Sequence, residues 1–495
     1  MITVNVLRLP LLGSFLRWRH SRQALQLVLL VVASAVVVHG LFGPQLAPRN
    51  LATVLTSIHW RGLLIVSVLA AGNLFCTGCP MILVRDAGRR LYHPALRWPR
   101  WLRGKWLGIA LMVLVLFAYE LFDLWSLPRA TAWLVIGYFG LALVVDVIFS
   151  GATFCKHLCP IGQFNFTAST MAPTELRVVD VATCRSCRTA DCIKGRYAER
   201  GPESHPVERG LVERGLQPAR RRLVQRGCEL GLFLPVKVGN IDCTMCLDCV
   251  HACPHDNIAL QTRVPGAELL ETRRRSGIGR LTQRTDIAAL ALVFTFASLV
   301  SAFAMTSPGY AVEQQLAAMI GLHSEAPVLL TLFVFGLVVA PILLLGAAGL
   351  VMRGLTSDVP FSARELVVRY AFAMIPFGFG VWLAHYGFHL LTGILTVVPV
   401  LQSAVIDAFG HAMLGEPAWR WVGVQPGSVF PIQLGLVVLG AAGSFGLVHA
   451  TSLRDHPSAP TRASMPWLAI VAILTTTALW ILAQPMEMRA VSFFG

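Results

Sequence analysis

The chain has 495 residues, of which 55% are hydrophobic and only 14% are charged. Soluble domains carry roughly 25% charged residues, so this chain has too little polar surface to cover several soluble cores. Its mean hydropathy of +0.64 predicts a polytopic membrane protein. A net charge of +15 would suggest a nucleic-acid partner in a soluble chain. In a membrane protein the positions of the basic residues matter more, and we expect no nucleic-acid partner.

Nine stretches are apolar and long enough to cross a bilayer, which takes about 20 helical residues. They lie near residues 23–42, 60–75, 106–126, 130–149, 286–306, 327–352, 366–397, 429–451 and 466–484. The sequence therefore predicts an all-α membrane protein with about nine transmembrane helices. The second stretch is short and continues into a cysteine motif, so its boundary is the least well defined.

The basic residues fall mainly on one side of these spans. Of the 41 lysines and arginines, 36 lie in segments 1–22, 76–105, 150–285, 353–369 and 452–465. Because basic loops stay on the cytoplasmic side, we expect the amino terminus and the central segment in the cytoplasm. The carboxyl terminus is then outside. The expected location is the inner (cytoplasmic) membrane of a bacterium.

Shifts in composition divide the chain into three domains. Residues 1–160 contain four of the expected spans, and residues 286–495 contain five. Residues 161–285 are rich in Arg and Glu and contain eight of the twelve cysteines. Within them, the piece 196–226 is dense in Arg and poor in aromatic residues, which is typical of a solvated insertion near anionic headgroups.

The most specific motif in the chain is Cys243-x2-Cys246-x2-Cys249-x3-Cys253-Pro254. In bacterial ferredoxins this run supplies three thiolates to one 4Fe–4S cluster and a fourth to a second cluster. Zinc is a poor alternative, because zinc ribbons use two separated cysteine pairs. The run predicts that residues 161–285 form an inserted α+β dicluster ferredoxin-like domain.

A second run, Cys184-x2-Cys187-x4-Cys192, and the isolated Cys228 complete a two-cluster pattern. The cross-over that is usual in such proteins gives two sets of four. One set is Cys184, Cys187, Cys192 and Cys253, and the other is Cys228, Cys243, Cys246 and Cys249. The spacing of the second run is irregular. The alternative is that Cys228 is a buried structural cysteine and one cluster lacks a ligand.

Four cysteines remain, in the motifs Cys76-x2-Cys79-Pro80 and Cys155-x3-Cys159-Pro160. Both motifs follow spans that run towards the cytoplasm, so both reach the same membrane face and would form a third set of four. We favour a third iron–sulfur cluster at the membrane edge. A single metal ion and a redox-active dithiol are the alternatives. The flanking Arg85, Arg89, Arg90 and Lys156 would help to offset the negative charge of such a cluster.

Residues 154–163, FCKHLCPIGQ, resemble the membrane-edge Cys-Pro signature of the membrane polyferredoxins. This family includes the nitrous-oxide-reductase accessory flavoprotein, the quinol dehydrogenase subunit of periplasmic nitrate reductase and an oxidase-assembly polyferredoxin. The resemblance covers about residues 20–260. It implies electron transfer between the quinone pool, or a cytoplasmic donor, and a redox partner protein. The first Cys-Pro motif has two intervening residues where the family usually has three, and the five later spans lie outside the resemblance.

His385 and His389 stand four residues apart, hence on one face of the seventh expected span, in its outward half. Ionisable groups at membrane depth are functional candidates. Three roles remain open: a quinone or proton-exchange site, axial ligation of a b-type haem, or interfacial histidines bonded to backbone carbonyls. A haem would need a second helix, because these two histidines cannot bind opposite faces of one haem. Glu120 and Asp123 are candidates to join a proton path.

Together these features predict a membrane-bound electron-transfer protein. It would pass electrons between cytoplasmic 4Fe–4S clusters and a quinone or haem site in the membrane, as a subunit of a quinone-linked oxidoreductase. Its partners would be the quinone pool and redox partner proteins. One alternative is a maturation factor that reduces or delivers metal for a respiratory enzyme. Another is a subunit that couples electron flow to ion translocation.

Overall fold

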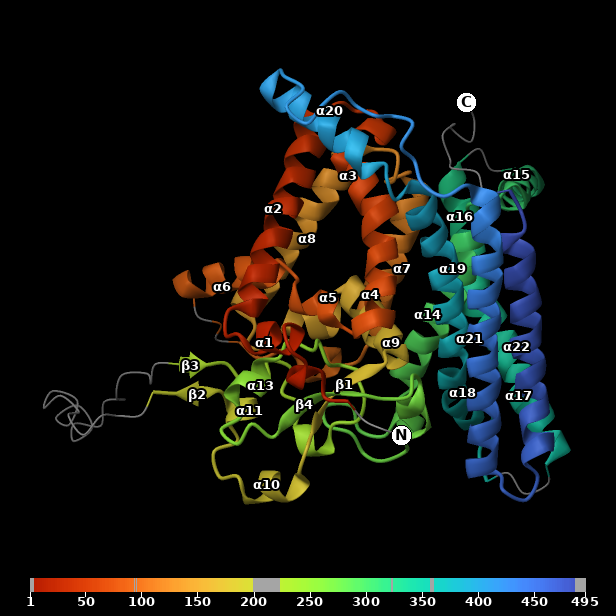
Figure 1. Ribbon diagram of the computed structural model, residues 1–495. Helices are drawn as coiled ribbons and strands as arrows, with labels where there is room; N and C mark the ends of the chain where they lie inside the picture. The colour runs from red at the N-terminus through yellow and green to blue at the C-terminus, as the bar shows by residue number, and fades with distance from the viewer. Residues whose placement is uncertain are drawn as a thin grey trace, which may run out of the picture.

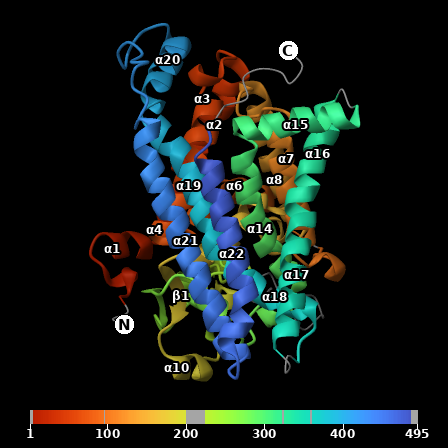
Figure 2. The same ribbon diagram turned by 90° about the vertical axis from the view of Figure 1, so that its right-hand side faces the viewer.

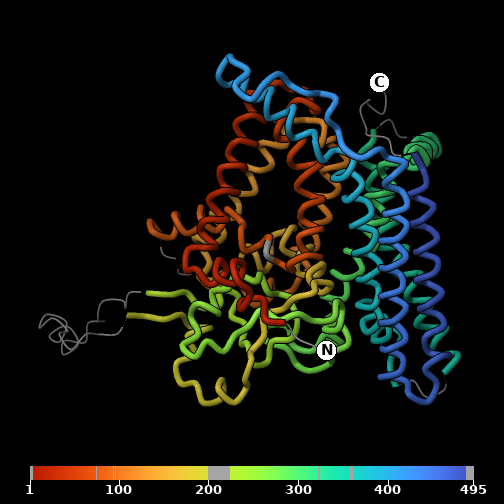
Figure 3. The backbone as a smooth tube through the Cα atoms, viewed as in Figure 1, coloured from red at the N-terminus to blue at the C-terminus, as the bar shows by residue number. Residues whose placement is uncertain are grey.

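The computed structural model describes residues 4–92, 94, 96–198, 223–321, 324–356 and 360–485. About 70% of the described residues are helical and 5% are in strands. Figure 1 shows long helices side by side, with the N-terminal helices on one side and the C-terminal helices on the other. The backbone trace in Figure 3 shows the cysteine-rich segment at one end of the N-terminal helices.

In the described part of the chain, eight helical segments are long and apolar enough to span a membrane. They are Ser21–Phe42 (α2), Leu51–Ala71 (α3 to α4), Pro128–Ile148 (α8), Thr285–Phe303 (α14), Glu325–Leu355 (α16 to α17), Ala363–Gly393 (α18 to α19), Pro426–Asp455 (α21) and Pro460–Leu482 (α22). Three of these segments consist of shorter pieces. The second span is α3 Leu51–Thr53, η3 Val54–Trp60 and α4 Arg61–Ala71. The segment Glu325–Leu355 is α16 Glu325–Val334, η10 Phe335–Val339 and α17 Ala340–Leu355, and the segment Ala363–Gly393 is α18 Ala363–Ala371, η11 Phe372–Met374 and α19 Ile375–Gly393. The helical, multi-span part of the predicted fold is confirmed.

The third predicted span, 106–126, is a shorter helix than expected. Helix α7 (Trp106–Leu121) has 16 residues and therefore a length of about 24 Å. The hydrocarbon core of a bilayer is about 30 Å thick. The helix ends because a turn follows it, in which Asp123 has a positive φ of 42°. The prediction of nine long spans is thus corrected, within the described residues, to eight long helices and α7.

The second span begins at Leu51 instead of residue 60. The side chain of Asn50 accepts a hydrogen bond from the backbone N–H of Ala52 and caps this earlier start. Residues 54–60 then form the π-helical segment η3, which leads directly into α4. Polar residues such as Ser57 and His59 in this segment lower its hydropathy, and for this reason the sequence pattern missed it.

Helix α19 is the central helix of the C-terminal half. It packs against α14, α21 and α4, and Figure 2 shows it behind α21 and α22. Glycines make the closest of these contacts: a Cβ at Gly380 would lie 2.6 Å from the carbonyl oxygen of Leu436. Small residues allow helix backbones in membranes to approach closely. As a result, most side chains of α19 are buried.

Two further helices, α15 (Ser307–Ile320) and α20 (Val397–Phe409), follow the membrane-spanning helices α14 and α19. Both lie at the end of the bundle opposite the cysteine-rich segment (Figures 1 and 2). The two ends of the bundle therefore differ in content: one has the cysteines and the strands, and the other has only helices and loops in the described residues.

The cysteine-rich segment contains two small antiparallel sheets. Strand β1 (Thr174–Val178) pairs with β4 (Ile258–Thr262), and β2 (Arg196–Tyr197) pairs with β3 (Leu223–Gln225). The start of the chain joins the first sheet, because Asn5 forms a bridge with Gln261. Most of the predicted Arg-rich insertion, residues 199–222, lies outside the described residues. Its described ends are the paired strands β2 and β3.

Candidate functional site

All twelve cysteines are free thiols, and they gather into three groups of four. The distal quartet is Cys184, Cys187, Cys192 and Cys253; the middle quartet is Cys228, Cys243, Cys246 and Cys249; the membrane-edge quartet is Cys76, Cys79, Cys155 and Cys159. Thiols of one quartet lie close enough to repel one another when ionised. The structure brings together the same sets that the spacing assigns, and what they bind stays a prediction.

No compact single-ion site exists in the described residues: no three His, Cys, Asp or Glu side chains stand close enough together to hold one metal ion. A zinc ion holds its thiolates at about 2.3 Å from the metal. A four-iron cluster is larger, so its thiolates stand further apart. What the membrane-edge motifs bind, a third iron–sulfur cluster or a single metal ion, or whether they act as a redox-active dithiol, stays a prediction.

The distal quartet is formed by short, partly exposed segments. Cys184 lies in α10 (Val181–Ser186), whose start is capped by Asp180. The side-chain amide of Asn257 lies 3.4 Å from the Cys184 sulfur and donates a hydrogen bond to it. Backbone N–H groups and the Thr189 hydroxyl lower the pKa of Cys187 to about 7. They thereby favour the thiolate, which is the form that binds metal.

The distal and middle quartets share a local motif. Helix α11 (Asp191–Lys194) follows Ala190, which has a φ of +53°. Helix α13 (Asp248–Ala252) follows Leu247, which has a φ of +62°. In each helix the second residue is a cysteine of a quartet, and the two helices contact each other. Such strained residues are uncommon and concentrate at functional sites.

The middle quartet is buried against the membrane-edge segment. Cys243, Cys246 and Cys249 are all less than 9% exposed. The side-chain amide of Asn73 donates to the carbonyl of Cys243 at 3.0 Å. The Thr77 hydroxyl donates to the carbonyl of Met245 at 2.8 Å. Since Asn73 and Thr77 flank Cys76, the middle and membrane-edge quartets are held together directly.

The distal quartet contacts the middle quartet on its other side. The backbone N–H of Cys228 donates to the carbonyl of Cys192 at 2.8 Å. In addition, the backbone N–H of Leu232 donates to the sulfur of Cys228 at 3.4 Å. The three quartets therefore follow one another in the order distal, middle, membrane edge.

The sulfur of Cys159 in the membrane-edge quartet has polar partners. It accepts a hydrogen bond from the backbone N–H of Gly162 at 3.1 Å and lies 2.9 Å from the hydroxyl of Tyr138. The side-chain amide of Asn165 lies 3.5 Å from the Cys76 sulfur. Burial raises the pKa of Cys159 to about 12. Tyr138 comes from α8 and Asn165 from α9 (Pro160–Ala168), and the sequence analysis missed both.

An ion-pair network fastens the cysteine-rich segment to the membrane helices. Arg85 in α6 (Met81–Leu91) donates to both oxygens of Glu229 at 2.8 and 2.7 Å, and Arg22 in α2 pairs with Asp248. Burial alone would raise the pKa of Glu229, but Arg85 and Arg22 outweigh it and lower that pKa. The positive charge of Arg85, expected to face a cluster, is thus bound mainly to Glu229.

Lys156 is likewise engaged with protein groups. Its ammonium group donates to the carbonyl of Leu230 at 3.1 Å, and burial lowers its pKa. The neighbouring Lys105 forms an ion pair with Asp242. These contacts join the Cys155 motif to the loop of the middle quartet. The carbonyl of Leu230 is neutral, so this bond leaves the charge of Lys156 in place and within electrostatic reach of Cys228. Its effect on a bound cluster stays a prediction.

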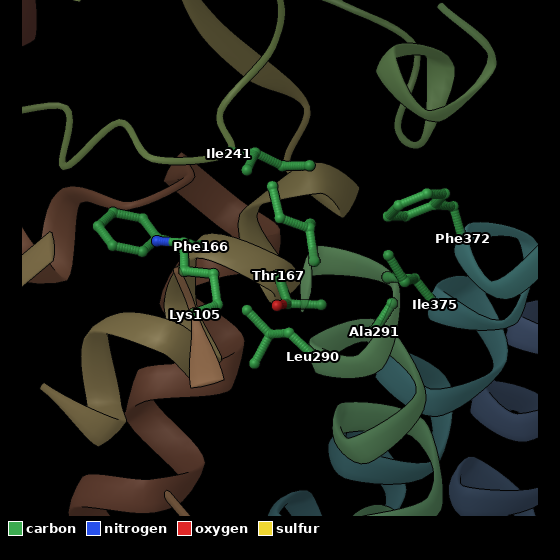
Figure 4. Close-up of a pocket in the computed structure, with 9 residues that line it drawn as sticks. Lys105, Phe166, Thr167, Ile241, Leu290, Ala291, Phe372 and Ile375 are labelled. Carbon is green, nitrogen blue, oxygen red and sulfur yellow. The ribbon is translucent and has the colours of Figure 1, made fainter. Parts of the chain in front are cut away.

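A small cavity lies where the C-terminal helices meet this loop (Figure 4). Lys105 and Thr167 are its polar lining residues, and Ile241, Leu290 and Phe372 are among the apolar ones. Its volume of about 10 Å³ is room for roughly one water molecule. The cavity is therefore too small for an organic cofactor.

His385 and His389 lie on α19 with their ring centroids 5.1 Å apart. His385 is 0% exposed. Among the described residues neither of its ring nitrogens has a hydrogen-bond partner, and the same holds for Nε2 of His389. Thus His385 is not bonded to backbone carbonyls, which was one of the three roles left open by the sequence.

Polar residues of two other helices lie close to these histidines. The Arg61 guanidinium of α4 stands 3.8 Å from the ring centre of Tyr119 and 5.6 Å from that of Tyr386. Buried Glu120 lies within electrostatic reach of Arg61. Asp123 is placed in the turn after α7. The sequence pattern points to Glu120 and the two histidines, but it gives no signal for Arg61, Tyr119 or Tyr386.

No family model, curated protein or solved structure matches the chain. The resemblance to membrane polyferredoxins therefore stays a prediction. Function has to be argued from the chemistry of the sites.

Proposed function

We propose that this chain is a membrane-bound electron-transfer protein in which three cysteine quartets hold three 4Fe–4S clusters in series. The observation that carries the proposal is the gathering of all twelve cysteines into three neighbouring groups of four. A chance arrangement would leave some of these thiols isolated. Bound clusters of this kind accept and release one electron at a time.

The protein groups around the sulfurs suit thiolate-ligated clusters. Backbone N–H groups donate to the sulfurs of Cys159, Cys228 and Cys253, and hydrogen bonds of this type tune cluster potentials. Positive-φ residues turn the chain around the quartets, as at Ala190 and Leu247. The role of Ala190 and Leu247 is to turn the chain so that the neighbouring thiolates are held in place.

The helix–cysteine motif around Ala190 and Leu247, together with the sheet of β1 and β4, supports an inserted dicluster ferredoxin-like domain. In that interpretation the distal and middle quartets are its two cluster sites. We further propose that this domain lies on the cytoplasmic side of a bacterial inner membrane. The uneven distribution of basic residues, 36 of 41 on one side of the spans, supports the orientation.

The two ends of the series differ in their accessibility. The cysteines of the distal quartet are all partly exposed, so a soluble redox partner protein can approach them. The membrane-edge quartet lies next to the transmembrane helix α8, because the Cys159 sulfur is 2.9 Å from the hydroxyl of Tyr138. It is therefore suited to exchange electrons with a carrier inside the membrane, either a quinone or a haem.

Iron analysis of the anaerobically purified full chain tests this proposal. We expect about twelve iron and twelve acid-labile sulfide per chain. The variant Cys159→Ser should lose about four of each while keeping the electron paramagnetic resonance signals of the other two clusters. The matched variant Cys187→Ser should instead lose the distal signal. A wild-type value near eight contradicts a membrane-edge cluster.

Reporter fusions test the orientation separately. A reporter fused near Arg209 should be active only as a cytoplasmic probe, and one fused at Gly495 should report the outside. Both positions lie outside the described residues. If the two fusions report the same side, the proposed orientation is wrong.

A further inference from the structure

His385 is a buried ionisable group without a bonded partner. It is 0% exposed, and both ring nitrogens lack hydrogen bonds within the described chain. A buried polar group left unsatisfied costs about 1–3 kcal/mol, and native structures rarely contain one without a reason. A neutral imidazole of this kind can donate one hydrogen bond to a ligand and accept another from it.

Close packing of α4 on α19 brings Arg61 within electrostatic reach of His385 and His389. A Cβ at the next residue, Gly62, would lie 2.4 Å from Cβ of Leu390 and 3.0 Å from the carbonyl oxygen of Tyr386. The two backbones can approach this closely only because residue 62 is glycine. Arg61 also follows the π-helical segment η3 directly, and π-helical turns are frequent at functional sites.

The site combines hydrogen-bond donors of three kinds. The imidazoles of His385 and His389, the guanidinium of Arg61 and the phenol of Tyr386 come from α4 and α19. The Ser301 side chain of α14 hydrogen-bonds to Tyr386. The charged groups of Arg61 and of the nearby Glu120 lie at membrane depth, where burying a charge is costly and marks a functional site. This set matches a planar ligand whose oxygen atoms accept hydrogen bonds and exchange protons.

A haem fits the surroundings less well. Two axial histidines would have to come from different helices, and the nearby His59 of η3 is already engaged. Its ring nitrogens lie 3.0 Å from the carbonyl oxygen of Val54 and 3.2 Å from that of Ile394. His39 accepts a hydrogen bond from the backbone N–H of Leu51 at 3.1 Å. The geometry thus favours a quinone over a haem.

We propose that His385, His389, Arg61 and Tyr386 bind the headgroup of a membrane quinol and take up its protons when it is oxidised. Oxidation breaks the two O–H bonds of the quinol and yields one quinone, two protons and two electrons. The free nitrogens of His385 and His389 accept the protons. The electrons leave one at a time to a one-electron acceptor of the iron–sulfur class, and for this acceptor the inference rests on the proposed function. Quinone reduction is the same step reversed.

The position of the site along α4 agrees with this role. Arg61 and Ala71 are the first and last residues of α4, which corresponds to about 15 Å along the helix axis. Cys76 follows five residues later. The same helix therefore connects the quinol site with the membrane-edge quartet.

Calorimetric titration of the oxidised full-length protein in detergent with decylubiquinone and menadione tests the binding step. We expect saturable binding of at least one of these quinones. The variants His385→Leu/His389→Leu and Arg61→Gln should each weaken it about tenfold or more. The matched control His449→Leu removes a histidine that lies on α21 and is exposed. It should bind like the wild type.

The spectrum and the iron content separate the other outcomes. A reduced-haem absorption band in the wild type that disappears in the double variant would overturn the quinone assignment in favour of a haem. Unchanged binding in both site variants overturns the inference. Quinone binding at this site in a protein that holds no clusters contradicts the proposed function and leaves the binding site standing. Single variants His385→Gln and His389→Gln, checked by gel filtration, should weaken binding in the same direction even if the double variant does not fold.

Discussion

The distal and membrane-edge quartets each consist of four cysteines, but only the membrane-edge quartet contains a buried one: Cys159 is buried, whereas its other three thiols and all four distal thiols are partly exposed. The distal thiols lie in short helices and loops and are all partly exposed. Cys159 of the membrane-edge quartet is 9% exposed and contacts a tyrosine hydroxyl from a transmembrane helix. Burial acts on ionisation in both quartets: it raises the pKa of Cys159 to about 12 and that of the distal Cys192 to about 11. At Cys187 backbone N–H groups and the Thr189 hydroxyl instead lower the pKa to about 7.

Under the proposed function, this difference would allow one chain to serve two kinds of redox partner. An exposed site can exchange electrons with a soluble protein, and a buried site communicates only through the protein and the membrane. The middle quartet is hydrogen-bonded to both, through Cys192 on one side and Asn73 on the other.

Chelation should separate the quartets in time. When the loaded protein is incubated with an iron chelator and iodoacetamide, we expect about four of the twelve irons to leave first, with alkylation of Cys187. Cys159 should be alkylated last, because burial limits access. Mass spectrometry of the alkylated peptides gives the order. In denaturant all sites should react together, and simultaneous loss in the native protein would contradict the contrast in exposure.

Replacing Arg85 should lower the thermal stability of the cysteine-rich segment where it packs on the membrane helices. Arg85→Met leaves the carboxylate of Glu229 without its bidentate partner, and breaking a buried ion pair costs about 3–5 kcal/mol. Thermal unfolding should show a lower midpoint. The exposed pair of Arg273 and Glu271 provides the control: Arg273→Met should change stability by about 0.5 kcal/mol or less. Equal effects of both variants would show that burial does not matter here.

Lowering the pH should reduce the stability of the fold, because it protonates the buried carboxylate of Glu268. Burial alone would raise the pKa of Glu268, but Arg263 and Arg275 outweigh it and hold the pKa below the usual 4.5. Its stabilising contribution is therefore complete above pH 4.5 and is lost as the pH falls below that value. The slope is about 1.4 kcal/mol per pH unit for one proton.

Unfolding midpoints measured between pH 7 and pH 3 check this effect. The variant Glu268→Gln should be less stable at pH 7 and lose less stability on acidification than the wild type. The exposed Glu416→Gln serves as the control and should follow the wild-type curve. If Glu268→Gln keeps the full acid slope, another group is responsible.

The smallest predicted effect concerns the hydrogen bond between Tyr138 and Cys159. A donor to a cluster sulfur stabilises the more negative, reduced state. Tyr138→Phe should therefore lower the potential of the membrane-edge cluster by some tens of millivolts, since about 59 mV corresponds to a tenfold change for one electron. Redox titration followed by paramagnetic resonance measures it. The exposed Tyr92→Phe should shift nothing, and a shift of the distal potential in Tyr138→Phe would contradict the assignment.

The sequence predicted the helical membrane architecture because hydropathy is a local property of each segment. It failed at two boundaries for local reasons: η3 is polar enough to hide the start of its span, and a turn at Asp123 shortens α7. The cysteine sets followed from three signals: the short motifs, the usual ferredoxin cross-over for Cys228 and Cys253, and the shared membrane face of the two Cys-Pro motifs. Their joining into neighbouring quartets required the fold.

The list of chemical groups and the spans that carry them can be read from the sequence alone. Tertiary structure decided which groups meet. Arg85 and Glu229 are 144 residues apart, and Arg61 reaches Tyr386 only because Gly62 lets α4 pack closely on α19. No periodicity encodes such pairs, because they depend on helix packing between distant parts of the chain. The same packing leaves His385 buried and without a hydrogen-bond partner among the described residues, and the proposed quinol site rests on this observation.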